Sequence, residues 1–81
     1  METEADKNLV RLLKKGNIDA FDKLFASYSN SIYRFAFSFL KNKMDAEGVV
    51  QEVFFRVWKN LKKINEYYSF KAFVFSISYH L

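Results

Sequence analysis

The residues of this chain that could act as acids, bases or metal ligands form no recognisable catalytic or metal-binding pattern. His80 is the single histidine, cysteine is absent, and the acidic pairs Asp19 with Asp22 and Asp45 with Glu47 stand where helices are expected to begin. Acid–base catalysis needs a positioned partner group, and a zinc site needs several Cys, His or carboxylate ligands. No glycine-rich phosphate loop occurs. The sequence therefore predicts neither an enzyme nor a cofactor or metal site, and its polar residues point to recognition instead.

The stretch 45–58 places two different surfaces on one expected helix. Gln51, Glu52 and Phe55 fall on one side, where a solvated face ordinarily carries only charged groups. Apolar residues recur on the other side at the three-and-four spacing of a buried stripe, namely Ala46, Val49, Val50, Val53, Phe54, Val57, Trp58 and Leu61. An aromatic anchor beside two hydrogen-bonding groups is typical of an interface hot spot. We expect a docking face here, the alternative being an ordinary solvated helix.

A second candidate surface is the loop expected after this helix, Asn65-Glu66-Tyr67-Tyr68-Ser69. Residues 53–81 hold five basic residues against one acidic residue, and this excess equals the net charge of +4 of the whole chain. Aromatic rings stack on bases, amides bond base edges and cations hold phosphates. The loop therefore predicts recognition of an unpaired nucleobase. The alternatives stay open that the lysines solubilise a helix end and that the tyrosines cover the edge of the core.

Length and composition limit the chain to one small domain. It has 81 residues, of which 51% are hydrophobic and 20% aromatic, enough to build a single core. The absence of cysteine excludes disulfides and favours the cytoplasm. No apolar run reaches the roughly 18 residues of a membrane span. We expect a soluble protein without a membrane partner.

The elements that must position these surfaces are all helices, because proline is absent and no strand-like alternation occurs. The spacing predicts a compact all-α bundle of four helices, with Gly16 as a left-handed stop after the first. The expected ranges are about Glu4 to Lys15, Ile18 to Leu40 with a bend at 29–31, Asp45 to about Lys62, and Phe70 to Leu81. The expected N-terminal caps are Thr3, Asn17, Asp45 and Ser69. Phe70, Phe73, Val74, Ile77 and Leu81 form the apolar stripe of the last helix.

In its order of motifs, the chain resembles a known family. The family's helical signature reads Asp-Ala-Glu-Asp, then an aliphatic pair, then Gln-Glu, then Val-Phe, and after a variable triplet Trp. Positions 45–58 match this signature, except that Gly48 replaces the second Asp. Further matches are Leu12-Leu13-Lys14-Lys15-Gly16-Asn17, Ala20-Phe21, Leu24-Phe25, Tyr28, Ile32-Tyr33-Arg34-Phe35-Ala36 and Phe70-Lys71-Ala72-Phe73-Val74-Phe75-Ser76-Ile77. The series is similar to the second conserved region of bacterial RNA polymerase sigma factors of the extracytoplasmic-function group. It spans almost the whole chain.

This resemblance implies that the docking face binds the beta-prime subunit of the RNA polymerase core through Gly48, Gln51, Glu52 and Phe55. Gly48 departs from the family pattern. With Asp45 as the cap, an Asp at position 48 would bond back to the cap, and Gly loses that bond and about 1 kcal/mol of helix propensity. The resemblance also implies a linker and a second helical domain, so that residues 1–81 correspond to an isolated first domain.

For nucleic acid, the resemblance implies capture of a base flipped from the non-template single strand of the promoter minus-ten element. By position, the resemblance assigns the pocket wall to Asn60, Ile64, Ile77 and His80. The residues that contact the base are those of the loop, Asn65, Glu66, Tyr67, Tyr68 and Ser69. The residues that hold phosphates are Arg56, Lys59, Lys63 and Lys71. His80 stands where the family usually has Asn, and Ile64 replaces an aromatic residue.

The leading interpretation is therefore a specificity domain of transcription initiation that binds polymerase core and helps melt the minus-ten element. In the family, anti-sigma factors mask these same surfaces. The first alternative is a helical interaction module that binds a regulatory protein and no DNA. A helix-turn-helix duplex reader is less consistent with the sequence, because the last helix is too apolar to present base-contacting side chains to a groove.

Overall fold

Four α-helices and one short 3-10 turn make up the residues that the structure, a computed structural model, describes: 4–65, 67 and 69–80. They are α1 (Glu4–Lys14), α2 (Ile18–Leu40), α3 (Lys43–Lys59), η1 (Leu61–Lys63) and α4 (Phe70–Tyr79). The predicted all-α class is confirmed. Thr3, Glu66, Tyr68 and Leu81, which the sequence analysis singled out, lie outside the described residues.

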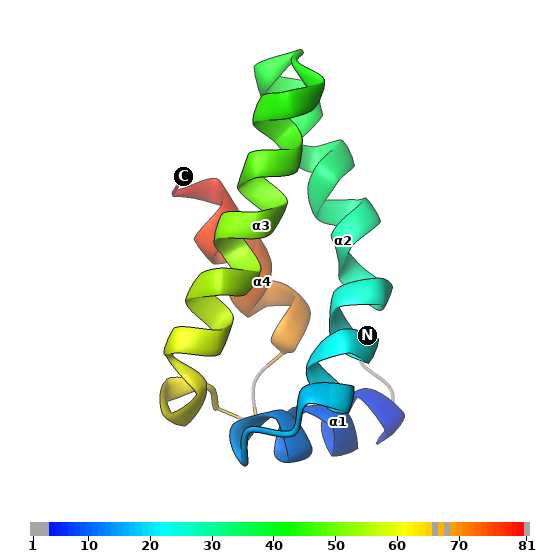
Figure 1. Ribbon diagram of the computed structural model, residues 1–81, viewed down its shortest axis with the longest axis vertical. Helices are drawn as coiled ribbons and strands as arrows, with labels where there is room; N and C mark the ends of the chain where they lie inside the picture. Colours follow the sequence, from blue (N-terminus) through cyan, green and yellow to red (C-terminus); the bar gives the residue numbers. More distant parts are fainter. Residues whose placement is uncertain (1–3, 66, 68, 81) are drawn as a thin grey trace.

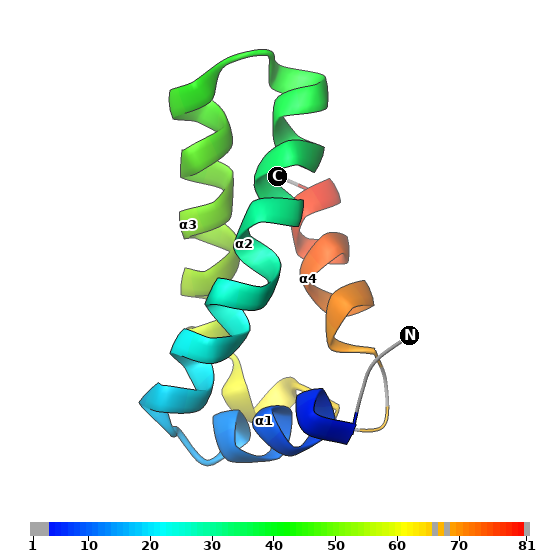
Figure 2. The same cartoon turned by 90° about the vertical axis from the view of Figure 1, so that its right-hand side faces the viewer.

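The long helices α2 and α3 run side by side in opposite directions and share the most extensive helix–helix contact (Figure 1). The shorter α4 packs against both of them, and α1 crosses beneath the end of the bundle where α2 begins (Figure 2). The tight turn between α2 and α3 therefore lies at one end of the molecule, and α1 lies at the other. The 65–69 loop, which connects η1 to α4, is at the α1 end.

Three of the predicted helix boundaries are confirmed by their local geometry. Gly16 adopts φ +84°, the left-handed conformation that ends a helix and that L side chains rarely adopt. The Ala20 N–H donates to the side-chain Oδ1 of Asn17 (2.9 Å), so Asn17 caps α2. The Ala72 N–H donates to Ser69 Oγ (3.1 Å) at the start of α4. Each cap satisfies an amide that has no partner within its helix.

The predicted start of the third helix is wrong. Asn42 is the N-cap of α3, because its Oδ1 accepts the Asp45 N–H at 3.0 Å, and Asp45 is the third residue inside the helix. Lys41 makes the turn with φ 56° and an N–H that donates to Phe37 O. Gly48 consequently lies in the second turn of α3, where no side chain could bond back to a cap. The prediction that Gly48 costs α3 a cap bond is therefore wrong. The lower helix propensity of Gly is the only cost that remains at this position.

The end of the third helix also differs from the expectation. Regular α-helix stops at Lys59, and the next residues tighten into η1, in which the Lys63 N–H donates to Asn60 O (3.0 Å). Such a 3-10 turn satisfies carbonyls at a helix end while it changes the direction of the chain. The buried side chain of Ile64 then anchors the start of the loop.

The core sits where all four helices meet, and the predicted α3 stripe is confirmed for Ala46, Val50, Val53, Phe54 and Val57. Val49 and Leu61 are partly buried, and Trp58 is 40% exposed with its ring packed edge-on against Phe21 (5.3 Å between centroids). The other buried apolar residues are Val10, Leu13, Ala20, Leu24, Ile32, Ala36, Ile64, Phe70 and Val74. None of the described helices has the combination of length and hydropathy that spanning a membrane requires.

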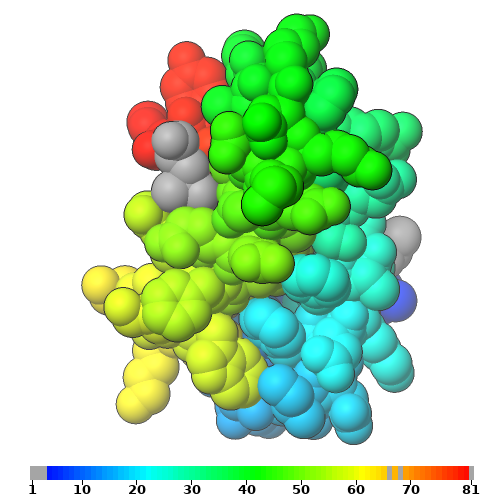
Figure 3. Space-filling model, turned by 45° about the horizontal axis from the view of Figure 1, so that its top comes forward, coloured from blue at the N-terminus to red at the C-terminus, as the bar shows by residue number. Residues whose placement is uncertain are grey.

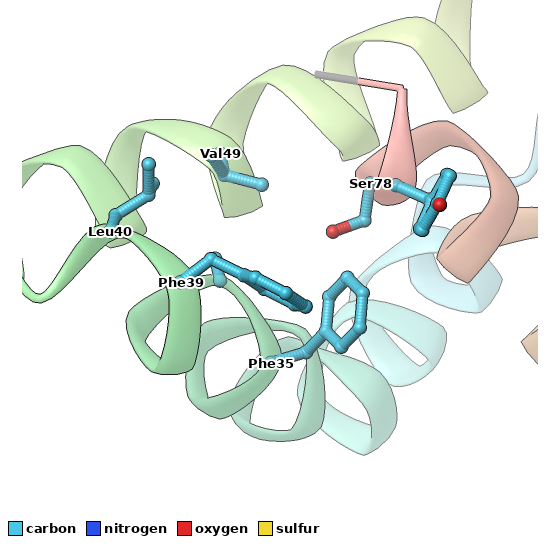
Figure 4. A pocket seen from close by; sticks show the side chains of 7 residues that line it. Phe35, Phe39, Leu40, Val49 and Ser78 are labelled. Atoms are coloured by element: carbon cyan, nitrogen blue, oxygen red, sulfur yellow. The ribbon is translucent and has the colours of Figure 1, made fainter.

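An apolar pocket of about 250 Å³ lies at the end of the bundle opposite α1 (Figure 4). Phe35, Phe39 and Leu40 of α2, Val49 of α3 and Ser78 of α4 line it. Ser78 is buried, and its hydroxyl has no hydrogen-bond partner in the described part of the chain. The periodicity of α4 assigned Ile77 to the core, whereas Ser78 is the more deeply buried of the two.

Candidate nucleic-acid interface and docking face

The outward side of α3 presents the predicted docking residues to solvent. Gln51 is exposed, Glu52 is partly exposed and the Phe55 ring is 55% exposed. Val53 and Val57, which flank these positions in sequence, are fully buried against the core. A helix whose opposite side is packed so closely has little freedom to rotate, so it holds the three exposed side chains in a fixed arrangement.

Two cations that were predicted to hold phosphates lie against this docking face. Arg56 Nε donates to Glu52 Oε1 at 3.1 Å, one helical turn apart, with both side chains about half exposed. Lys59 Nζ lies 5.1 Å from the centroid of the Phe55 ring, within the range of a cation–π contact. The structure therefore brings Arg56 and Lys59 next to the polymerase-docking residues rather than next to the loop.

A shallow hollow of about 320 Å³ extends the docking face from α3 onto α2. Its α3 side is formed by Glu47, Val50 and Gln51, and its α2 side by Phe25, Ser29, Asn30 and Tyr33. Figure 3 shows the two helices forming one continuous face, with α2 in cyan beside the green and yellow of α3. No function was predicted for these α2 residues from the sequence. The available signal was that Phe25 and Tyr33 stand among the family-like motifs of 24–36.

The loop after η1 borders a larger hollow of about 590 Å³. Lys63, Ile64, Asn65 and Ser69 line it on the loop side, and Phe70, Ala72, Phe73 and Ser76 line it on α4. Ile64 and Phe70 are both buried and fix the two ends of the loop. Apolar side chains thus form its inner part, while an amide, a hydroxyl and an ammonium group stand around it.

Local hydrogen bonds shape the loop between these two anchors. The Tyr67 N–H donates to Asn65 Oδ1 at 2.9 Å, which closes a short side-chain turn. Ser69 caps α4, as described above. Tyr67 is 84% exposed. It lines a separate hollow together with Arg11 and Lys14 of α1 and with Lys15, which directly follows α1. The loop is thus bordered by a hollow on each side.

The remaining residues predicted for the DNA pocket lie elsewhere. Asn60 donates an Nδ2 hydrogen to Arg56 O (2.8 Å) and lines a neighbouring hollow with Lys59 and Lys63, but it does not line the one beside the loop. Ile77 is partly buried against the core, and His80 is exposed at the end of α4 with its ring 5.4 Å from that of Tyr79. Lys71 is exposed in the first turn of α4. The structure therefore brings together four of the predicted residues, Lys63, Ile64, Asn65 and Ser69, and not Asn60, Ile77 or His80.

Acidic and histidine side chains do not gather in the described part of the chain: no three of them come close enough to hold a metal ion. The chemistry available at both surfaces is hydrogen bonding, stacking and ion pairing. These are interactions of recognition, and they suit a macromolecular partner.

Comparisons with known proteins identify related sequences. The family model of sigma-70 region 2 matches residues 24–81. Over 75 residues the chain is 29% identical to the ECF RNA polymerase sigma factor SigW of Bacillus subtilis (strain 168), a match that covers 93% of this chain and 40% of that protein. No solved structure gives a significant match. The family match takes in well over half of the chain and confirms the resemblance drawn from its motifs, so this protein belongs to the sigma-70 region 2 family.

Proposed function

We propose that this chain is a transcription-initiation domain that docks on RNA polymerase core through α3 and captures an unpaired base of the minus-ten element in the hollow beside the 65–69 loop. The observation that carries the proposal is the composition of that hollow. Ile64, Phe70 and Phe73 supply apolar surface, while Asn65 and Ser69 supply hydrogen-bonding groups at its border. A flipped base needs this combination, because its faces are apolar and its edges are polar.

Asn65 is the residue that we expect to contact the edge of the base. Its Oδ1 already accepts the Tyr67 N–H, and this bond fixes the orientation of the amide. The two Nδ2 hydrogens of the amide are not used in that bond and can be donated to a base carbonyl or ring nitrogen. Preorganisation of this kind lowers the entropy that binding would otherwise lose.

Capture of a base also explains how such a domain would help to open a duplex. Removing one base from the stack costs a few kcal/mol, and contacts available only to the flipped base offset that cost. Lys63 at the border of the hollow and Lys71 in the first turn of α4 are placed to hold neighbouring phosphates. No covalent chemistry is required of any residue.

Docking on the polymerase is supported by the exposed Gln51, Glu52 and Phe55 and by the hollow that extends this face onto α2. The relative from Bacillus subtilis is named as an RNA polymerase sigma factor. The beta-prime subunit is the partner that the family resemblance implies. An anti-sigma factor that covers the same face would compete with the polymerase for it.

Fluorescence anisotropy with labelled single strands tests the DNA part of the proposal. We expect the unaltered chain to bind one minus-ten sequence more tightly than scrambled strands of the same composition, at every salt concentration. Asn65→Ala should reduce this preference while circular dichroism shows an unchanged helix content. Equal binding to all sequences by the unaltered chain would contradict base capture.

A second candidate function is a helical interaction module without DNA recognition. Exposed apolar side chains at the α2–α3 turn favour it, since Phe39 is 70% and Met44 79% exposed. Capture of purified polymerase core by the immobilised chain separates the two functions. The proposed domain binds core and a specific single strand, whereas the interaction module binds neither.

A further inference from the structure

A second hollow, of about 490 Å³, lies on the α1 side of the 65–69 loop. Arg11, Lys14 and Lys15 line it from the end of α1, and Tyr67 lines it from the loop. No residue of this group except Tyr67 has been assigned a function above. Three cations beside one exposed aromatic ring are the groups that bind a nucleic-acid backbone and stack on its bases.

The α1 side of this hollow is basic. Residues 7–18 contain four basic side chains, Lys7, Arg11, Lys14 and Lys15, and no Asp or Glu. Cations in the last turn of a helix also interact favourably with its macrodipole, which accounts for Arg11 and Lys14 on structural grounds alone. The macrodipole does not account for Tyr67, whose ring is 84% exposed beside these cations although it belongs to a loop fifty residues further along the chain.

The position of Tyr67 follows from the turn at Asn65. The bond from the Tyr67 N–H to Asn65 Oδ1 holds these two residues together, yet Asn65 lines the base hollow and Tyr67 lines the α1 hollow. The η1 turn, which leads into the loop, also contacts α1. A single strand whose base enters the first hollow would therefore run across Tyr67 to the basic end of α1.

We propose that the α1 hollow is a second nucleic-acid subsite, which binds the phosphates next to the captured base through Arg11, Lys14 and Lys15 and stacks a neighbouring base on Tyr67. The inference rests on the proposed function, because the captured base sets the position of the strand. It extends the DNA surface from the loop onto the first helix, to residues outside the 24–81 family match.

Salt dependence of single-strand binding tests the subsite, with the double variant Lys14→Gln and Lys15→Gln. Each phosphate contact to a single strand contributes about 0.7 to the slope of log affinity against log salt, so the slope should become shallower by about 1.4. Between about 50 and 200 mM salt, the affinity of the unaltered chain should then fall about sevenfold more than that of the variant. The matched control is Lys41→Gln with Lys43→Gln, which removes the same charge at the α2–α3 turn, the opposite end of the molecule.

Two lengths of oligonucleotide locate the effect. On a strand extended on both sides of the captured base, the Lys14/Lys15 variant should lose slope and the control pair should not. On a strand that ends at the captured base, both variants should match the unaltered chain. Tyr67→Ala should weaken binding of the extended strand roughly tenfold, the range of one lost stacking contact.

The outcomes separate the subsite from the proposed function. If the unaltered chain binds the extended strand with sequence preference and the Lys14/Lys15 variant keeps its slope, the subsite is overturned and base capture stands. If the unaltered chain shows no sequence preference, base capture fails and the subsite fails with it. Equal loss of slope in the Lys14/Lys15 and Lys41/Lys43 variants would show a general effect of net charge and would also overturn the subsite.

Discussion

The exposed face of α3 and the 65–69 loop are held in place in different ways. Gln51, Glu52 and Phe55 project from a helix whose other side is buried in the core, so tertiary packing fixes their positions. The described loop residues Asn65, Tyr67 and Ser69 are instead exposed to solvent. The geometry of the loop depends on two buried anchors, Ile64 and Phe70, and on short-range bonds within the loop.

This difference suits the two proposed partners. A large protein surface is best met by side chains that are already rigid, since ordering them on binding costs affinity. A flipped base enters a hollow, and a short-range bond such as the one that orients Asn65 can hold the group that contacts its edge. The comparison predicts that the loop end is sensitive to the loss of a single anchor, whereas the α3 face tolerates local changes.

The largest effect should come from Phe70→Ala. Phe70 is 1% exposed, and its ring packs against Tyr28 at 5.5 Å between centroids. The change should lower the free energy of unfolding by about 3–5 kcal/mol and abolish single-strand binding. Urea denaturation followed by circular dichroism measures the first effect. The control is Phe39→Ala, because that ring is 70% exposed and its loss should cost far less. Similar costs for the two variants would contradict the role of Phe70 as an anchor.

A smaller effect, of opposite sign, is expected on the α3 side. Gly48→Ala should raise the free energy of unfolding by about 1 kcal/mol, because Ala has the higher helix propensity and an added Cβ meets no atom within 4 Å. Thermal denaturation is the measurement. Gly16→Ala is the matched control, since φ +84° at that position is strained for any L side chain. A loss of stability in Gly48→Ala would show that the backbone of α3 needs glycine there.

The difference between the α3 face and the loop also explains which features of the structure could be predicted from the sequence. Periodic spacing identifies which side of a helix is buried, and it correctly separated Gln51 and Phe55 from Val53 and Val57. Periodicity does not say which of two nearby polar residues caps a helix. Both Asn42 and Asp45 suit that role, and the choice depends on the left-handed turn at Lys41.

The nucleic-acid surface was harder to predict because it is assembled from separate elements. Lys63, Ile64, Asn65 and Ser69 are close in sequence and meet at one hollow. His80 and Ile77 were assigned by family position, but neither lines this hollow, because Ile77 packs against the core and His80 stands at the C-terminal end of α4. The proximity of Tyr67 to the end of α1 likewise follows from how α1 crosses the bundle.

The most direct test of the account measures polymerase-core capture and single-strand binding on the same pair of variants. Gln51→Ala with Glu52→Ala should reduce core affinity about thirtyfold, as expected of an interface hot spot, and leave single-strand affinity unchanged. Lys63→Gln with Asn65→Ala should do the reverse. The control Glu4→Ala, which also removes one carboxylate from the exposed side of a helix, should retain both activities. Core affinity that survives in the Gln51/Glu52 variant would contradict the account, as would joint loss of both activities in either folded variant.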